Sequence, residues 1–192
     1  MAALLVDEII LPSVEAVSSA LEESSWNADF QQLDRGKKPN QITFVGSGQT
    51  SLFRFDLGNR TLQVAESAKG QLNFGIPTSP QASHRFGRRV LESETLTCFD
   101  PGTGVEVVSE PGFSAYTIGF SSERLSELAQ MLELPDLLSA NQMLGTQRYP
   151  SAHRLSRLRS ELRAFFGLST HPLEAARHNA CRDMDSELSL IH

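Results

Sequence analysis

Between Gln41 and Phe120 the chain is built from short runs of β-branched and aromatic residues, divided by Gly, Pro, Asn and Asp. We interpret eight of these runs as strands: ITFVGS, SLFRFDL, TLQVAE, QLNFGIP, RFGRRVL, TLTCFD, VEVVS and AYTIGF. Turn residues at such intervals are typical of all-β sandwiches and barrels. The pattern therefore favours antiparallel pairing in a jelly roll or small barrel, which hides most strand edges.

Three turns between these runs are read from their residues. The segment DLGNR, residues 56–60, predicts a tight hairpin, because Gly58 and Asn59 tolerate the positive φ angles that such a turn needs. Pro101-Gly102 and Pro111-Gly112 predict stiff corners on either side of a short strand. We interpret both Pro-Gly pairs as scaffold without a chemical role.

Helices are predicted on both sides of the β region. The first begins after Ser13, its expected N-cap, and carries the apolar stripe Val14, Val17 and Leu21. Three more are expected after Phe120: one capped by Ser121 or Ser122 and ended by Pro135, one from Ser151 to Gly167, and one from His171 that contains Cys181 and reaches His192. Because the last helix has no stop signal, we expect the chain to be the front part of a longer protein.

Charge and cysteine content exclude several classes of protein. The net charge of −6 argues against nucleic-acid binding by this chain, since duplex DNA selects proteins with a basic face. The two cysteines, Cys98 and Cys181, match no disulfide or zinc spacing, which indicates a cytoplasmic protein. Asp7 and Glu8 interrupt the apolar N-terminus, so we predict neither a signal peptide nor contact with a membrane.

Metal chemistry has few candidate ligands in this sequence. A metal-binding barrel of the cupin type needs several histidines on neighbouring strands, whereas the β region contains one histidine, His84. We therefore expect no metal, no other cofactor and no catalytic residues.

A small-molecule site is expected inside the barrel. Eleven Phe and two Tyr residues are enough to line an apolar cavity, which is the usual form of such a site. The candidate ligand-binding residues are Phe53, Phe55, Asn73, Phe74, Arg88, Phe99 and Tyr116. The alternative for each aromatic residue is that it simply fills a core.

The helix expected after Ser151 carries a stripe suited to helix packing. Its members, spaced three, four and three residues apart, are the candidate dimer-interface residues Leu155, Leu158, Leu162 and Phe165. The same stripe suits packing against the outside of the barrel or a neighbouring helix.

Three segments together resemble a known family. They are SSWNADFQQLDRGKKPNQITFV with Trp26, Gln32-Leu33 and Gly36, then LNFGIP at 72–77, and FDPGTGVEVVSEPGFSAYTIGFSSERL at 99–125. In order and spacing they are similar to the N-terminal sensor domain of AraC-type transcriptional regulators, especially those similar to the ethanolamine-operon regulator. The resemblance extends from about residue 24 to residue 190.

This resemblance implies a mainly β fold with a helical appendage, that is, a cupin-like antiparallel barrel followed by an α-helical hairpin. The expected parts are an N-terminal strap and helix (1–40), a cupin-like barrel (41–120) and a helical dimerisation region (121–192). It further implies a small effector, a homodimer, and DNA binding only through a C-terminal domain with helix-turn-helix motifs that is absent here.

Two other functions stay open at this point. A metal-free cupin-like enzyme would need an acid–base set inside the barrel, for which Arg88, Glu92 and Glu94 are the scattered candidates. A stand-alone dimerisation module, or a free-standing partner of a full-length regulator, would need no effector.

Overall fold

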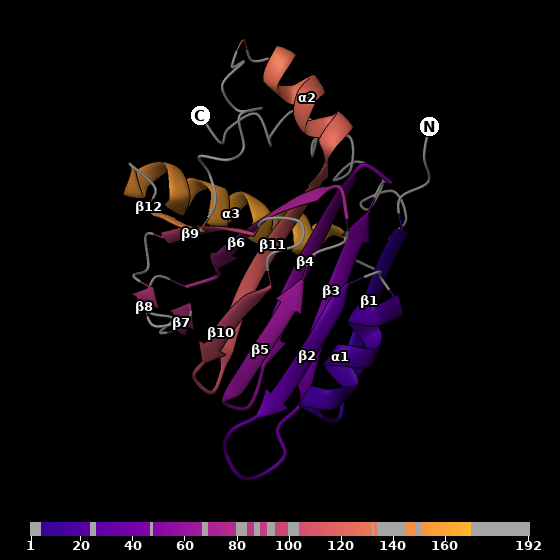
Figure 1. Ribbon diagram of the computed structural model, residues 1–192, viewed down its shortest axis with the longest axis vertical. Coiled ribbons are helices and arrows are strands. Elements are labelled where there is room, and N and C mark those ends of the chain that lie inside the picture. The colour runs from indigo at the N-terminus through magenta and orange to yellow at the C-terminus, as the bar shows by residue number, and fades with distance from the viewer. Residues whose placement is uncertain are drawn as a thin grey trace.

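The computed structural model describes residues 5–23, 26–46, 48–66, 69–79, 84–86, 89–91, 95–99, 104–131, 133, 145–148 and 151–169 (Figure 1). Within these residues two antiparallel sheets enclose an apolar interior, and helices are added before and after them. The predicted fold class, a mainly antiparallel β domain with a helical appendage, is confirmed. Among the described helices, none is long and apolar enough to cross a membrane.

The larger sheet, sheet A, has seven strands among the described residues. In spatial order they are β1 (Leu5–Leu11), β3 (Asn40–Gly46), β4 (Thr50–Leu57), β11 (Phe113–Ser121), β6 (Gln71–Pro77), β9 (Thr95–Phe99) and β12 (Gly145–Arg148). Sheet B has five: β2 (Asn27–Gln32), β5 (Thr61–Glu66), β10 (Val105–Ser109), β7 (His84–Phe86) and β8 (Arg89–Leu91).

The eight predicted strands are present, with one division and three additions. The run RFGRRVL divides into β7 and β8, which pair with each other. The additions are β1, at the N-terminus where a strap is expected, and β2 and β12, which were not expected from the sequence. Because β1 pairs with β3 and β2 pairs with β5, these two N-terminal strands belong to the sheets.

The turn DLGNR is not the hairpin that its residues predict. It connects β4 in sheet A with β5 in sheet B, and neither Gly58 nor Asn59 has a positive φ. Gly58 is instead required by a close approach, because a Cβ there would lie 2.6 Å from the carbonyl oxygen of Pro39. Because the chain passes from one sheet to the other at this turn, β4 and β5 do not pair, and the local preference of these residues for a hairpin is not realised.

The corner at Pro111-Gly112 is confirmed, and it also changes sheets, from β10 to β11. Gly112 has a φ of 79°, a left-handed conformation that glycine adopts without strain. Its backbone N–H donates to the carbonyl oxygen of Leu57 at 3.0 Å, which ties this corner to the end of β4. Pro101-Gly102 lies outside the described residues.

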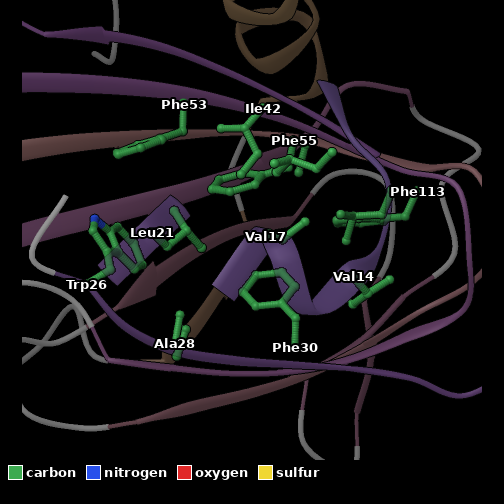
Figure 2. Packing of buried hydrophobic residues seen from close by; sticks show 14 residues of the cluster. Val14, Val17, Leu21, Trp26, Ala28, Phe30, Ile42, Phe53, Phe55 and Phe113 are labelled. Carbon is green, nitrogen blue, oxygen red and sulfur yellow. The ribbon is translucent and has the colours of Figure 1, made fainter. Parts of the chain in front are cut away.

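The interior between the sheets is an apolar core that includes helix α1 (Val14–Glu23). The hydroxyl of Ser13 accepts a hydrogen bond from the N–H of Ala16 at 3.3 Å, which confirms the predicted N-cap. Figure 2 shows side chains of α1 between aromatic residues of the two sheets, with Phe55 on one side and Phe30 on the other. Helix α1 therefore closes the side of the domain where β1 and β2 form the sheet edges.

A second apolar core lies on the outer face of sheet A, under helices α2 (Ser122–Met131) and α3 (Ala152–Ser169). Figure 1 shows α3 running across the back of this sheet. The hydroxyls of Ser121 and Ser151 accept hydrogen bonds from backbone N–H groups in the first turns of these helices, as predicted.

Two expectations about the helical part change, and a third concerns residues outside the described part of the chain. Helix α3 continues through Gly167 to Ser169, so Gly167 does not end it. Strand β12 lies between α2 and α3 in the chain, so the expected simple helical hairpin is interrupted by a strand that extends sheet A. The predicted helix from His171 to His192, with Cys181, lies outside the described residues.

Candidate ligand-binding site

A cavity of about 70 Å³ lies between the two sheets. At roughly 10 to 15 Å³ for each water, this space holds about five waters or one small organic molecule. The lining residues come from α1, from sheet A and from sheet B: Leu21, Trp26, Phe30, Phe55, Gln63, Ala65, Gly75, Ile76, Pro77, His84, Thr97, Phe99, Val105, Val107, Phe113, Ala115 and Thr117.

Small side chains on the inner face of sheet A make room for the cavity. Strand β11 presents Ala115 and Thr117 to it, and the neighbouring strand β6 presents Gly75. The outer positions of β11, by contrast, carry Tyr116 and Ile118, both buried under α3. From Ala115 to Ile118, β11 is therefore bulky on the helix side and small on the cavity side.

The cavity is apolar with four polar side chains at its walls: Gln63, His84, Thr97 and Thr117. Gln63 Nε2 donates to Ser109 Oγ at 3.1 Å, which fixes the amide on sheet B. The ring of His84 lies 5.2 Å from that of Phe113, tilted by 56°, and the side chain is buried. This combination of aromatic walls and few polar groups is typical of a site for a small organic ligand.

Catalytic groups are sparse around this cavity. Of the described residues that line it, His84 is the one titratable side chain. General acid–base chemistry usually needs two groups whose environments set their pKa values apart. Over the described residues, no group of three or more His, Cys, Asp or Glu side chains is placed to hold a metal ion.

Four of the predicted ligand-binding residues lie on the inner face of sheet A. Phe55 and Phe99 line the cavity. Phe53 packs next to it in the inner core, with its ring 4.8 Å from Phe44. Asn73 is completely buried on the same face of β6 as Gly75, beyond the lining residues.

Phe74 and Tyr116 lie on the opposite face, so their placement inside the barrel needs correction. Tyr116 stacks on Phe166 of α3, with ring centroids 5.3 Å apart and planes 16° from parallel. Burial there raises the pKa of the Tyr116 hydroxyl. The inner and outer faces were exchanged because α3 buries the outer face of sheet A as well. Arg88, Glu92 and Glu94 lie outside the described residues.

Several lining residues were not selected from the sequence, namely Trp26, Phe30, His84 and Phe113. Phe30 belongs to β2, a strand that was not expected, although Ala28 and Phe30 alternate with polar residues in NADFQQ. Phe113 shares its face of β11 with the smaller Ala115 and Thr117. A bulky residue followed by small ones at alternate positions was the signal available in the sequence.

The predicted dimer-interface leucines pack within their own chain. Leu155, Leu158 and Leu162 are at most 5% exposed and belong to the outer core on sheet A. Phe165 is partly buried against the same core. This arrangement corresponds to the alternative of packing against the outside of the barrel. Contact of α3 with a second chain stays a prediction.

Helix α3 is also hydrogen-bonded to the wall of the cavity. Arg159, 7% exposed, donates from Nε to the carbonyl oxygen of Pro77 at 2.8 Å, and Pro77 lines the cavity. Ile76 joins the two regions a second time, because it lines the cavity and packs in the outer core. The cavity and α3 therefore share two consecutive residues of β6.

Comparison with known proteins identifies a shared fold. No model of a protein family matches the chain, and a search of curated proteins finds no match. Among solved structures, the AraC-like transcriptional activator CuxR matches with a TM-score of 0.54 and 12% identity, over 96% of this chain and 70% of that one. At this identity the likeness shows the fold alone.

Two further structures resemble about half of the chain. A cupin 2 conserved barrel domain protein from Salinispora arenicola CNS-205 has a TM-score of 0.34 and 14% identity, over 55% of this chain and 85% of that one. A mutant of the oxalate decarboxylase OxdC from Bacillus subtilis has a TM-score of 0.35 and 11% identity, over 58% and 34%.

Proposed function

We propose that this chain is the ligand-sensing and dimerisation domain of an AraC-type transcription regulator. The observation that carries the proposal is an apolar cavity between the two sheets of a domain whose fold is shared, over 96% of the chain, with an AraC-like activator. In this proposal the chain is cytoplasmic and not an enzyme, and DNA is contacted by a separate C-terminal domain. The finer assignment to the ethanolamine-operon regulator type stays a prediction from sequence.

The effector that suits the cavity is small and largely apolar. Phe30, Phe55 and Phe113 give it broad apolar walls, and these aromatic rings favour a flat or compact molecule. The four polar wall residues are too few for a sugar or a polyol, whose hydroxyls would lose their hydrogen bonds to water without replacement. A cavity of about 70 Å³ limits the effector to a small molecule.

The contacts of α3 couple the cavity to a helix on the surface of the domain. A ligand that presses on Ile76 or Pro77 displaces groups that α3 also contacts, through the outer core and through Arg159. A ligand shifts a conformational equilibrium only by its difference in affinity for the two states. The shared residues of β6 are where this chain would develop such a difference.

Effector binding is tested by filling the cavity. Ala115→Leu adds volume at the cavity wall, whereas Ala28→Leu adds the same volume in the inner core at a position that does not line the cavity. A metabolite library is screened for compounds that raise the melting temperature, since an effector at a hundred times its Kd stabilises the fold by about 2.7 kcal/mol.

We expect a hit to shift the parent and Ala28→Leu but not Ala115→Leu. A hit that shifts all three proteins equally binds elsewhere and contradicts the assignment of the site. A complete library without a hit, together with a stable dimer, favours the stand-alone dimerisation module. Turnover of a hit by the parent favours the enzyme.

Because Leu155, Leu158 and Leu162 are buried within the chain, dimerisation requires a different face of α3. The side of α3 turned to solvent has exposed residues at intervals of four, and they are mostly small: Ala152, Ser156, Ser160, Ala164 and Leu168. Small residues let a second helix approach closely. We propose this face as the contact with a second copy.

The oligomeric state tests this face by sedimentation. Ala164→Arg adds charge at an exposed position of α3, and Gln130→Arg adds it at an exposed position of α2. We expect dimers for the parent and for Gln130→Arg, and monomers for Ala164→Arg. Equal association of all three contradicts the interface. A Leu158→Arg variant does not serve here, because Leu158 is buried in the fold of the single chain.

A further inference from the structure

A buried amide without hydrogen-bond partners lies next to the cavity. Asn73 is 0% exposed, and neither its Nδ2 nor its Oδ1 has a partner within the described part of the chain. The Oγ of Ser51, on β4, is buried and is unpartnered in the same sense. Buried polar groups in folded proteins are almost always paired, because an unpaired one destabilises the native state. Such groups need an explanation, and a bound water or ligand that completes their hydrogen bonds is one.

A glycine lies between these two side chains. Gly119 of β11 lies directly opposite Ser51 on one side and Asn73 on the other. A Cβ at position 119 would overlap Oδ1 of Asn73 and lie 2.5 Å from Oγ of Ser51. The two polar side chains therefore converge over Gly119, and any larger residue would displace them. We call Ser51, Asn73 and Gly119 the polar cradle.

The polar cradle lies beyond the lining residues of the cavity, on the same face of sheet A. Asn73 is two residues from Gly75 on the same face of β6, and Gly119 is two residues from Thr117 on the same face of β11. Two residues of a strand span about 7 Å, close to the length of a substituted aromatic ring. Phe99, which lines the cavity, is directly opposite Asn73 in the register.

The chemistry of the cradle selects a neutral group. An asparagine amide presents a donor and an acceptor side by side, so it pairs best with a group that offers an acceptor next to a donor. An ionised carboxylate in the same place would be a buried charge, and the described lining residues contain no cation other than a protonated His84. An amide, lactam or urea edge matches both requirements.

We propose that the polar cradle binds the neutral amide or lactam edge of the effector while its apolar ring occupies the cavity. This inference rests on the proposed sensing function and specifies its ligand class. It also accounts for the polar identity of positions 51 and 73 on a face of sheet A that is otherwise largely apolar around the inner core.

Three probes of similar size test the inference on the full chain by NMR titration. Benzamide carries the neutral amide, benzoate carries a charge in its place, and toluene carries neither. We expect benzamide to bind about tenfold or more tightly than the other two, the discrimination that one bidentate amide pair supplies. Equal binding of benzamide and toluene would overturn the inference and leave only water in the cradle, with the sensing function intact. Binding of none of the three overturns the inference, whereas the sensing function is decided by the metabolite screen.

Variants keep this test independent of folding. Asn73→Leu removes the unpaired amide at similar volume, so we expect a higher melting temperature without ligand, unchanged toluene binding and no preference for benzamide. Thr117→Val is the matched control, because it removes a cavity hydroxyl and leaves the cradle in place. We expect it to keep the preference. A preference for benzamide that persists in Asn73→Leu, or is lost in Thr117→Val, assigns amide recognition to another group and contradicts the proposal.

Discussion

The guanidinium Nε of Arg159 donates a 2.8 Å hydrogen bond to the carbonyl oxygen of Pro77, and this bond joins a long surface helix to the wall of the internal cavity. Both partners are covered by the fold: Arg159 is 7% exposed although it carries a charge. Hydrogen bonds to charged groups are stronger than neutral ones, and a partner left unpaired is costly. The bond therefore contributes to holding α3 against sheet A.

Replacement of this arginine tests the contribution. We expect Arg159→Met to lower the free energy of unfolding by about 1.5 to 3 kcal/mol in urea titrations, because the carbonyl of Pro77 loses a charged donor. Arg157→Met is the control on the same helix: its Nε pairs with Glu161 Oε1 at 2.7 Å, but at the surface. Arg157→Met should lower the free energy of unfolding by about 0.5 kcal/mol or less. Equal losses for the two variants would contradict a special role for Arg159.

Acid stability depends in part on the Asp34 carboxylate. Asn59 Nδ2 donates to Asp34 Oδ1 at 2.9 Å, and this bond lowers the pKa of Asp34 below its ordinary value. The stabilisation is therefore fully present above pH 4, roughly the pKa in the unfolded chain, and is lost as the pH falls through the lower pKa of the folded state. We expect Asp34→Asn to show a shallower loss of stability below pH 4 than the parent. Identical pH profiles in denaturant titrations would refute this.

The corner between β4 and β5 requires a residue without a Cβ. At Gly58 a Cβ would lie 2.6 Å from the carbonyl oxygen of Pro39, where only backbone movement relieves the overlap. We expect Gly58→Ala to lower the free energy of unfolding by about 1 to 3 kcal/mol. Gly104→Ala is the control, since that position has open space and no positive φ; its stability should change by about 0.5 kcal/mol or less. A tolerated Gly58→Ala would show that this corner is more adaptable than its contacts indicate.

Gly167 lies inside α3 and has open space around it. Glycine in a helix is unfavourable relative to alanine, so Gly167→Ala should raise the free energy of unfolding by about 0.5 to 1 kcal/mol. At Gly70, which also has open space but a φ of 77°, the same change should lower it by about 1 to 2 kcal/mol. Thermal unfolding of the two variants checks the opposite signs. Destabilisation by Gly167→Ala would mean that the helix ends there in a left-handed residue.

The positions of most strands follow from local chemistry. Runs such as SLFRFDL and TLQVAE alternate with turn residues, and eight of the described strands or strand pairs lie where those runs predict. The caps at Ser13, Ser121 and Ser151 are equally local, because a hydroxyl needs to reach an N–H only three residues ahead. In the same way, the alternation within β4 correctly placed Phe53 and Phe55 on a common face of that strand. The alternation within β11 did the same for Tyr116 and Ile118.

Which face points inward was decided by the tertiary structure. Strand β11 has an apolar face with Tyr116 and Ile118, and the sequence alone assigns that face to the interior of a barrel. In the folded chain the buried stripe of α3 covers it, so the smaller residues Ala115 and Thr117 face the cavity. The physical reason is that a sheet covered on both sides has no solvent face to mark its orientation, and periodicity within one strand carries no information about what packs against it. Local sequence was sufficient for most of the strands, for the caps and for the apolar stripes, whereas the packing of α3 determined which residues form the site.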